Sequence, residues 1–330
     1  MTNRGNRPRN GHPRPRPRQV IRRVAVTAVA LLAAVTVASF GYNLASADPA
    51  SRPPGLTMIK AGGFDTRYRS WGSAGSPIVL IPGAFETADT FAALGAVLGT
   101  DHRVFAIDLT GTGYSQPSPP FSAGHLAAQV LAFVRAEHLT GRDAPVLVGH
   151  SSGAAVAGMA ALGGGGAIAG VIFLDGDALP LPGAFFAGHL LIDPYRTSLL
   201  RLALSSSWLI RTIYASQCGP DCPPLTAAGV ETWRRPLQQP GFAAAISYTL
   251  QHGIPAMTTA QLARLEASPL SKRVIYGADD PQLSAAAATR AAARIGAPAP
   301  VAVPGRHLTM ISSPGPLAAA ISAFAASIRP

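Results

Sequence analysis

The stretch VLVGHSSGAA, from Val146 to Ala155, places Ser151 between two glycines directly after an apolar run. The apolar run predicts a buried strand, and the Ala-rich sequence that follows predicts a helix. A chain that turns this sharply from strand to helix strains the serine backbone, and side chains two residues to either side would collide. Gly149 and Gly153 occupy those two positions. The stretch therefore predicts a nucleophilic serine, and the alternative is a Gly/Ser-rich turn without chemistry.

The residues beside Ser151 have predicted roles of their own. A serine hydroxyl is a weak nucleophile until a base removes its proton. His150 belongs to the turn itself, and we expect it to pack beside the serine rather than act as that base. The backbone N–H of Ser152 is expected to point to the position where an oxyanion would form.

A base and an acid that orients it are expected later in the chain. Of the eight histidines, only His307, in VPGRHLTM, follows the last predicted strand. Asp279 and Asp280, in YGADDP, lie on the turn after the preceding strand. His307 is therefore the candidate base, with either aspartate beside it, and the alternative is an ordinary histidine in a surface loop.

Strands and helices are predicted to alternate along most of the chain. Short apolar runs rich in β-branched residues predict buried strands at residues 76–83, 102–111, 144–150, 169–176, 272–277 and 300–305. Helices are predicted between or after them at residues 87–98, 122–138, 152–162, 284–295 and 315–327. Apolar strands that alternate with helices indicate an α/β fold, with a mostly parallel, doubly wound sheet covered on both faces.

Residues 178–270 interrupt this alternation. They contain helical stretches, prolines and bulky aromatic residues but no convincing strand, and they are too long for a loop inside a compact domain. We predict a helical cap inserted late in the sheet, between two parts of the core at residues 57–177 and 271–330. Most of its aromatic residues are expected to pack internally, and one or two to line an apolar pocket.

The motifs GHSSG, YGADDP and GRH together resemble those of the α/β-hydrolase superfamily, specifically its lidded branch of esterases, lipases and epoxide-hydrolase-like enzymes. Two further stretches agree: LIPGAFET (Leu80–Thr87) is similar to the family's oxyanion loop, and DLTGTGYSQP (Asp108–Pro117) is similar to its D-x-x-G-x-G-x-S stretch. The resemblance covers residues 57–328 and implies the α/β-hydrolase fold with a serine nucleophile.

The resemblance also implies which residue is the acid. Counted from Gly277, the family's G-x-x-D pattern makes Asp280 the acid, with Asp279 as the fallback. Some members carry the acid after the earlier strand instead, which would make it Asp175 or Asp177.

The predicted oxyanion loop departs from the family at one position, because Pro82 stands where the family has a histidine. The resemblance implies that the donor comes from the residue after Gly83. Ala84 and Ser152 are therefore the predicted donors, with Phe85 as an alternative, and the substitution predicts a loop tuned to a different substrate preference.

The function that follows is hydrolysis of a small hydrophobic carboxylic ester through an acyl-enzyme intermediate. A serine in place of an aspartate at position 151 argues against dehalogenase and epoxide-hydrolase chemistry. One alternative is the same triad used for C–C bond hydrolysis, thioester hydrolysis or acyl transfer. Another is a catalytically inactive hydrolase fold that serves for binding. No cofactor and no metal are expected.

The N-terminus predicts export. Residues 1–23 contain eight arginines and no acidic residue, and residues 24–47 read as a signal peptide or a transmembrane anchor, followed by a Pro-rich linker at 48–56. Cleavage after Ala47 and an uncleaved anchor are both compatible with the sequence; a disordered tail before a buried helix is a third alternative. The positive-inside rule keeps the arginines in the cytoplasm, so the rest is either anchored outside or secreted.

Charge and cysteine usage agree with an exported protein. The net charge is +11, but without those eight arginines the chain has 19 basic and 16 acidic residues, so no basic face is predicted to bind nucleic acid. Cys218 and Cys222 are predicted to form a local disulfide, and two free thiols are the alternative.

Overall fold

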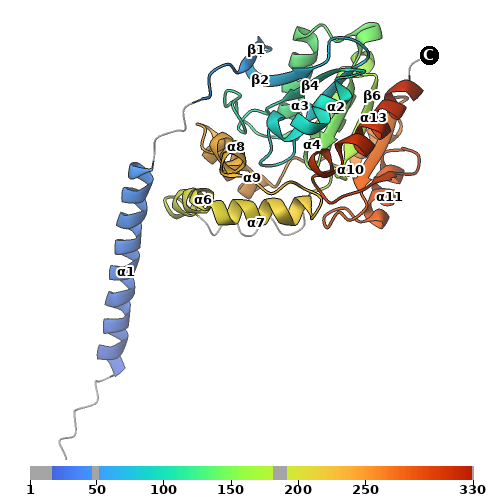
Figure 1. Ribbon diagram of the computed structural model, residues 1–330. Coiled ribbons are helices and arrows are strands. Elements are labelled where there is room, and N and C mark those ends of the chain that lie inside the picture. Colours follow the sequence, from blue (N-terminus) through green and yellow to red (C-terminus); the bar gives the residue numbers. More distant parts are fainter. Residues whose placement is uncertain (1–16, 47–51, 181–191, 329–330) are drawn as a thin grey trace, which may run out of the picture.

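The apolar runs form the middle of one eight-stranded sheet (Figure 1) in the computed structural model, which describes residues 17–46, 52–180 and 192–328. The strands are β1 Thr57–Ala61, β2 Phe64–Trp71, β3 Pro77–Ile81, β4 Arg103–Ile107, β5 Val146–His150, β6 Gly170–Leu174, β7 Ser271–Gly277 and β8 Val301–Val303. They lie in the order β1-β2-β4-β3-β5-β6-β7-β8, and all neighbours from β4 to β8 are parallel. All six predicted strands are present, and the predicted fold class is confirmed.

The hairpin of β1 and β2 was not predicted. The two strands pair antiparallel around Gly62 and Gly63, which have φ values of 57° and 85°, and β2 pairs antiparallel with β4. Both strands are rich in polar residues and only partly buried. They therefore lack the continuous apolar run by which the central strands were recognised.

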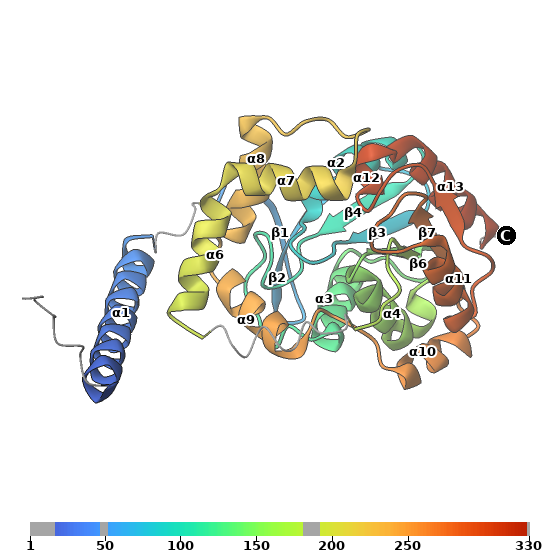
Figure 2. The same cartoon turned by 90° about the horizontal axis from the view of Figure 1, so that it is seen from below.

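Helices connect β6 to β7, in the interval where a cap was predicted. We refer to four of them as the cap: α6 Tyr195–Ser205, α7 Ser207–Cys218, α8 Ala227–Leu237 and α9 Phe242–His252. Figure 2 shows α6 and α7 crossing the side of the molecule seen from below. No strand occurs in the described residues between positions 178 and 270. The next helix, α10 Thr259–Glu266, packs on the core through Leu262 and Leu265, so we place the end of the cap before it.

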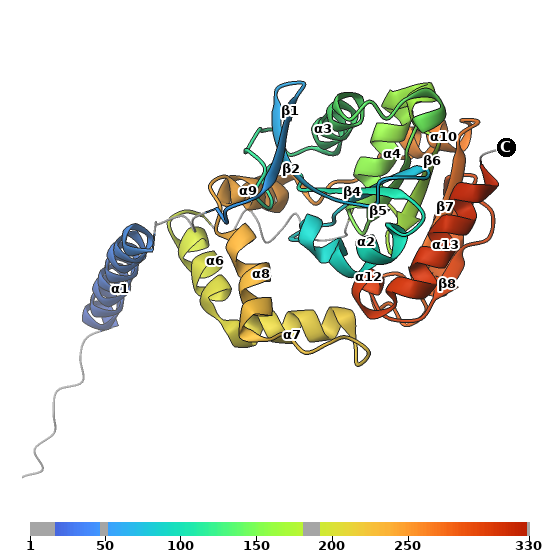
Figure 3. The same ribbon diagram turned by 45° about the horizontal axis from the view of Figure 1, so that its top comes forward.

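The N-terminal helix α1, Pro17–Ala45, stands apart from the sheet and lies beside α6 (Figure 3). It is the one helix among the described residues that is long and apolar enough to cross a membrane. Residues 1–16 of the predicted Arg-rich region, and Ala47 and residues 48–51 of the predicted export segment and linker, lie outside the described residues.

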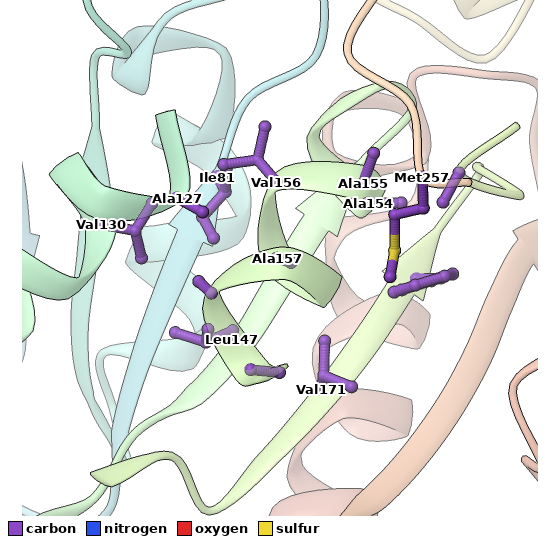
Figure 4. Packing of buried hydrophobic residues seen from close by; sticks show 14 of the residues in the cluster. Ile81, Ala127, Val130, Leu147, Ala154, Ala155, Val156, Ala157, Val171 and Met257 are labelled. Carbon is purple, nitrogen blue, oxygen red and sulfur yellow. The ribbon is translucent and has the colours of Figure 1, made fainter. Parts of the chain in front are cut away.

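The strands bury alternate side chains on opposite faces, each covered by its own helices. One face packs against α3 Ala123–Ala136, α4 Gly153–Gly164, α10 and α11 Ala285–Arg294. The other packs against α2 Ala92–Leu98, α12 Thr309–Ser312 and α13 Pro314–Ser327. Figure 4 shows Ile81, Leu147 and Val171 of three strands facing the small side chains of α4. Because the neighbouring strands from β4 to β8 are parallel, their carboxyl ends all lie at one edge of the sheet.

Substitution of Phe173, a fully buried residue of β6, should strongly destabilise the fold. Its ring fills the space beside Gly158 of α4, next to Met257. Phe173→Ala should lower the free energy of unfolding by about 3–5 kcal/mol, because the lost burial leaves a cavity. Chemical denaturation measures the change. Val97→Ala, at a position on α2 that is 39% exposed, is the matched control and should change it by less than about 1 kcal/mol.

Candidate active site

Ser151 lies on the turn between β5, which ends at His150, and α4, which begins at Gly153. Its backbone φ is 52°, in the left-handed region that residues with a side chain rarely adopt. A Cβ on Gly149 would lie 2.2 Å from the carbonyl oxygen of Gly153, and a Cβ on Gly153 would lie 2.5 Å from that of Pro82. The sharp strand-to-helix turn is therefore present, and its close contacts require glycine at both positions.

His307 and Asp280 are joined by a hydrogen bond. The distance from Nδ1 of the imidazole to Oδ2 of the carboxylate is 2.9 Å, and both residues are buried. Asp280 lies on the turn after β7, where its Oδ1 accepts the N–H of Gln282 at 2.7 Å. Because the carboxylate accepts the proton on Nδ1, the neutral imidazole presents an unprotonated Nε2. A general base needs this tautomer.

The loop that carries His307 lies beside the turn that carries Ser151. Nε2 of His150 is 2.8 Å from the carbonyl oxygen of His307, and the two ring centroids are 4.9 Å apart. The segments that carry the predicted nucleophile, base and acid thus lie together at the carboxyl edge of the sheet. Within the described part of the chain, no hydrogen bond joins Ser151 Oγ to His307. Catalytic hydrogen bonds often tighten only when substrate binds.

Asp175, one of the alternative acids, has other partners. Its Oδ1 accepts the N–H of Gly277, and its Oδ2 accepts the hydroxyl of Thr309, each at 2.6 Å. Burial raises the pKa of Asp175 to about 7, against the opposing effects of His150 and these hydrogen bonds. The side chain therefore fixes the end of β6 to the β7 turn.

The two remaining alternative acids also point elsewhere. Asp177 accepts the N–H of Leu179 at 3.0 Å, and Asp279 is exposed. Among the four predicted acids, all within the described residues, only Asp280 is hydrogen-bonded to His307. The geometry thus distinguishes Asp280 from the residue beside it in the chain.

The loop after β3, residues 82–87, passes directly over the serine turn; we call it the β3 loop. A Cβ on Gly83 would lie 2.9 Å from the Cβ of Ser151, so the backbones approach as closely as glycine allows. Within the described residues, the N–H groups of Ala84 and Ser152 donate no hydrogen bond. Two unpaired donors beside the serine fit the oxyanion role, which stays a prediction.

A buried ion pair that was not predicted from the sequence joins the β3 loop to the serine turn. Oε2 of Glu86 accepts a hydrogen bond from Nδ1 of His150 at 2.8 Å and another from the N–H of Gly83 at 2.9 Å. The other ring nitrogen, Nε2, lies 2.8 Å from the carbonyl oxygen of His307. A carboxylate and a carbonyl group can only accept, so both ring nitrogens donate and the ring of His150 is an imidazolium cation.

Burial and charge act on this pair in opposite directions. Burial alone lowers the pKa of His150, but the Glu86 carboxylate and its hydrogen bond raise it to about 9. Burial raises the pKa of Glu86, and the neighbouring cation more than offsets this, so that the pKa lies below its usual value. The pair is therefore charged at neutral pH. It ties together the β3 loop, the serine turn and the His307 loop.

A second buried carboxylate fixes the end of the β3 loop. Asp108, directly after β4, accepts the N–H groups of Ala88 and Tyr114 at 2.7 Å each. Nη1 of Arg67 on β2 lies 3.2 Å from the same carboxylate. The stretch similar to D-x-x-G-x-G-x-S thus holds the β3 loop in place, with a cation from the unpredicted hairpin.

A small cavity of about 60 Å³ lies between the β3 loop and the cap. Its lining residues are Phe85, Thr87, Asp89, Thr90, Thr232, Trp233 and Ile311. Phe85 has a φ of 65°, is 44% exposed, and lies with its ring centroid 6.0 Å from that of Phe242 in α9. The alternative oxyanion residue therefore contributes its side chain to the contact between the core and the cap.

A disulfide joins Cys218 and Cys222 at the end of α7. The same end of α7 contacts the His307 loop, because the N–H of Leu308 donates to the carbonyl oxygen of Gln217 at 3.3 Å. The bridge thus stiffens the part of the cap that packs on this loop. Within the described residues, no group of three or more His, Cys, Asp or Glu side chains could hold a metal ion.

The sequence model of the alpha/beta hydrolase family matches residues 78–320, more than half of the chain. The chain therefore belongs to the alpha/beta hydrolase family, and the fold and the arrangement at the sheet edge agree with this class of enzyme.

Individual relatives share 19–30% sequence identity with the chain. N-formylmaleamate deformylase of Pseudomonas putida is 30% identical over 119 residues, which are 36% of this chain and 43% of that protein. The chain thus matches less than half the length of this curated relative. A thermophilic esterase from Thermogutta terrifontis has a TM-score of 0.66 at 21% identity, over 85% of this chain and 100% of the esterase. A membrane phospholipase A has a TM-score of 0.65 at 19% identity, over 94% of this chain and 99% of the phospholipase. These two structures share the fold.

The Glu86–His150 pair should make stability depend on pH in the alkaline range. The pKa of His150 is raised from 6.5 to about 9, so its stabilising effect is complete below pH 6.5 and is lost as the pH rises through 9. The wild type should lose roughly 3 kcal/mol of unfolding free energy over this range. Glu86→Gln/His150→Gln, which keeps neutral hydrogen-bonding groups in place, should lack this loss.

Urea denaturation between pH 6 and pH 10 measures this dependence. His252→Gln, at an exposed histidine of α9, is the control and should keep the wild-type profile. An unchanged alkaline loss in the double variant would contradict the charged state inferred for His150.

Proposed function

We propose that the protein is an exported serine hydrolase that cleaves a hydrophobic carboxylic ester, with Ser151 as nucleophile, His307 as base and Asp280 as the acid that orients it. The observation that carries the proposal is the buried hydrogen bond from His307 Nδ1 to Asp280, on a loop held against the serine turn. The unprotonated Nε2 of that imidazole is the group that Ser151 requires.

The reaction proceeds by acyl transfer in two stages. His307 Nε2 takes the hydroxyl proton of Ser151 as Oγ attacks the ester carbonyl carbon, and the carbonyl oxygen becomes an oxyanion. The N–H groups of Ala84 and Ser152 donate to that oxyanion. Collapse breaks the bond to the alcohol oxygen, which takes the proton from His307, and leaves the acyl group on Ser151.

Water completes the cycle by the same groups. His307 removes a proton from water as the water oxygen attacks the acyl carbon, and a second oxyanion forms. Its collapse releases the carboxylic acid and returns the proton to Ser151. The Asp280 carboxylate stays ionised throughout and stabilises the imidazolium that forms in each stage.

The β3 loop and the cap support an apolar substrate. Phe85, Trp233 and Ile311 line the small cavity between the β3 loop and the cap, and Phe85 directly follows the predicted donor Ala84, so the apolar part of an ester would lie between the core and the cap. Two of the structural neighbours, an esterase and a membrane phospholipase A, agree with a carboxylic ester as substrate.

The N-terminal helix supports membrane attachment at the extracytoplasmic side. Its Arg-rich end would remain in the cytoplasm. The other end makes polar contacts with the cap, such as the one between Thr36 Oγ1 and the hydroxyl of Tyr195 at 2.6 Å. A signal peptide that is removed makes no lasting contact with the mature domain. The contacts between α1 and α6 therefore favour an anchor that is retained.

A fluorophosphonate probe tests the nucleophile. The wild type should be labelled on one serine and should hydrolyse p-nitrophenyl esters, whereas Ser151→Ala should lose both labelling and hydrolysis. Ser152→Ala is the matched control: it keeps the backbone N–H and should remain labelled. Intact mass spectrometry detects the adduct and also shows whether the N-terminal helix is retained.

The outcome also separates the alternatives. Absence of labelling in the folded wild type would favour a binding protein with the hydrolase fold. Labelling without hydrolysis of any ester, together with turnover of a thioester or a diketone, would favour the same triad in a different reaction.

Substitution of the acid should reduce turnover without preventing folding. Asp280→Asn replaces the carboxylate that orients His307 and should lower kcat by roughly 10³–10⁴-fold. Asp279→Asn, at the exposed neighbour, should stay within a few-fold of the wild type. Ester hydrolysis measures both, and equal losses in the two variants would contradict the assignment of Asp280.

A further inference from the structure

Apart from those on α1, the exposed apolar side chains of the described residues are concentrated on or just before two cap helices, α6 and α7. Outside α1, the exposed large apolar residues are Phe85, Val97, Ile192, Leu199, Leu202, Trp208 and Ile213. All except Phe85 and Val97 lie on α6, on α7 or just before α6, and we call those five the cap face. Trp208, at the start of α7, is 73% exposed, and Leu202 is 59% exposed. Exposed apolar residues that gather on two neighbouring helices indicate an interaction surface.

The cap face lies beside the helix that could cross a membrane. Asn43 Nδ2 of α1 donates to the carbonyl oxygen of Pro194 at 2.9 Å, and its Oδ1 accepts the hydroxyl of Ser198 at 3.0 Å. Thr36 and Tyr195 meet two turns lower on α1. These contacts fix α6 against the end of α1 that is farther from the arginines.

If α1 crosses a membrane, its direction would turn the cap face toward the bilayer. In Figure 1, α1 extends away from the sheet on the side where α6 and α7 lie, and Figure 2 views that side directly. Thr36 lies inside the uncharged stretch Val24–Phe40, so its contact with α6 is within the segment that would enter the bilayer. The start of α6 would then reach the level of the headgroups and upper acyl chains.

The charge of the two helices suits a lipid surface. Residues 195–218 contain Arg196, Arg201 and Arg211 and no aspartate or glutamate, and Arg196 pairs with Asp193 just before α6. Arg201 donates to the carbonyl oxygen of Asn43, and Arg211 is exposed on α7. Basic side chains attract anionic headgroups, and tryptophan is favoured at the membrane interface.

Helix α7 connects this surface with the candidate active site. It begins beside Trp208 and ends at the disulfide, where Arg306 Nη1 donates to the carbonyl oxygen of Ser216 at 3.2 Å. Arg306 directly precedes His307. The helix that carries the exposed Trp208 at one end therefore contacts the loop of the predicted base at the other.

We propose that the cap face binds the surface of the bilayer that α1 crosses, and that the candidate active site takes its acyl substrate from that bilayer. The first part rests on a retained α1 and does not depend on catalysis. The second part rests on the proposed serine hydrolase function.

The test uses the full chain, with α1 confirmed by intact mass, in vesicles of phosphatidylcholine and phosphatidylglycerol. The lipids carry bromine on the upper acyl chain, which quenches tryptophan on contact. Ser151→Ala prevents hydrolysis of the lipid, and the emission of Trp208 is the difference between Ser151→Ala and Ser151→Ala/Trp208→Phe. Trp208 should lose most of its emission to brominated lipid and little to iodide in the water.

A matched control moves the probe away from the cap face. Val97→Trp in the Ser151→Ala/Trp208→Phe background places an exposed tryptophan on α2 of a protein that α1 holds on the same vesicles. Its emission should be quenched by iodide and not by brominated lipid. This difference shows that contact with lipid is specific to the cap face.

Two other quenching results would each overturn the proposed contact between the cap face and the bilayer. Quenching of Trp208 by iodide alone would show that the cap face remains in water. Protection of Trp208 from both quenchers would show that protein covers it, such as a second copy of the chain. Because the readout is fluorescence, either result is distinguishable from a failure of ester hydrolysis.

A separate experiment tests whether the substrate is taken from the bilayer, by comparing an ester embedded in vesicles with a soluble ester. Leu199→Ser/Leu202→Ser should reduce hydrolysis of an ester embedded in vesicles while leaving hydrolysis of a soluble p-nitrophenyl ester unchanged. If the variant hydrolysed both the embedded and the soluble ester at the wild-type rate, the second part of the proposal would be overturned. The soluble esterase activity would be unaffected by that result.

Discussion

The arrangement of the site depends on the buried cation at His150. Its two ring nitrogens donate to Glu86 in the β3 loop and to the carbonyl oxygen of His307, so one side chain connects three segments that are remote in sequence. Burial of a charge is costly unless a partner of opposite charge and further hydrogen bonds satisfy it. Here the carboxylate supplies the charge and the Gly83 N–H satisfies the same oxygen. The requirement for full pairing therefore fixes the relative positions of the loops.

Acyl transfer would need loops whose relative positions are fixed in this way. An oxyanion is stabilised best by donors that are already in place, because no reorganisation is then required during the reaction. The β3 loop holds Ala84, and the turn holds Ser151 and Ser152, while the cation clamps both to the His307 loop. A proline at position 82, where the family has a histidine, is compatible with this design because Glu86 supplies the polar anchor of the loop.

Sequence patterns predicted the features that depend on local chemistry. The six central strands were recognisable because burial on both faces makes them apolar throughout, and the serine turn because its close contacts demand glycine. The β1–β2 hairpin lacked that pattern and was not predicted. The Arg67 cation on β2, which pairs with Asp108, was therefore not predicted either. The Glu86–His150 pair joins residues 64 positions apart, so no local pattern indicates it. The family resemblance favoured Asp280 among the four candidate aspartates, and its hydrogen bond to His307 agrees with that choice, which stays a prediction.

The cap joins two requirements that otherwise conflict. A hydrophobic ester dissolves poorly in water, whereas the charged groups of an acyl-transfer site need a fixed and polar surrounding. Helix α7 spans the distance between them, with Trp208 exposed at its first turn and its disulfide-closed end bonded to the loop of His307. Arg234 donates to the carbonyl oxygens of Leu204 and Ser205, so α8 holds the junction of α6 and α7. An apolar surface carried on helices fixed in this way can contact lipid without displacing the groups on which the chemistry would depend.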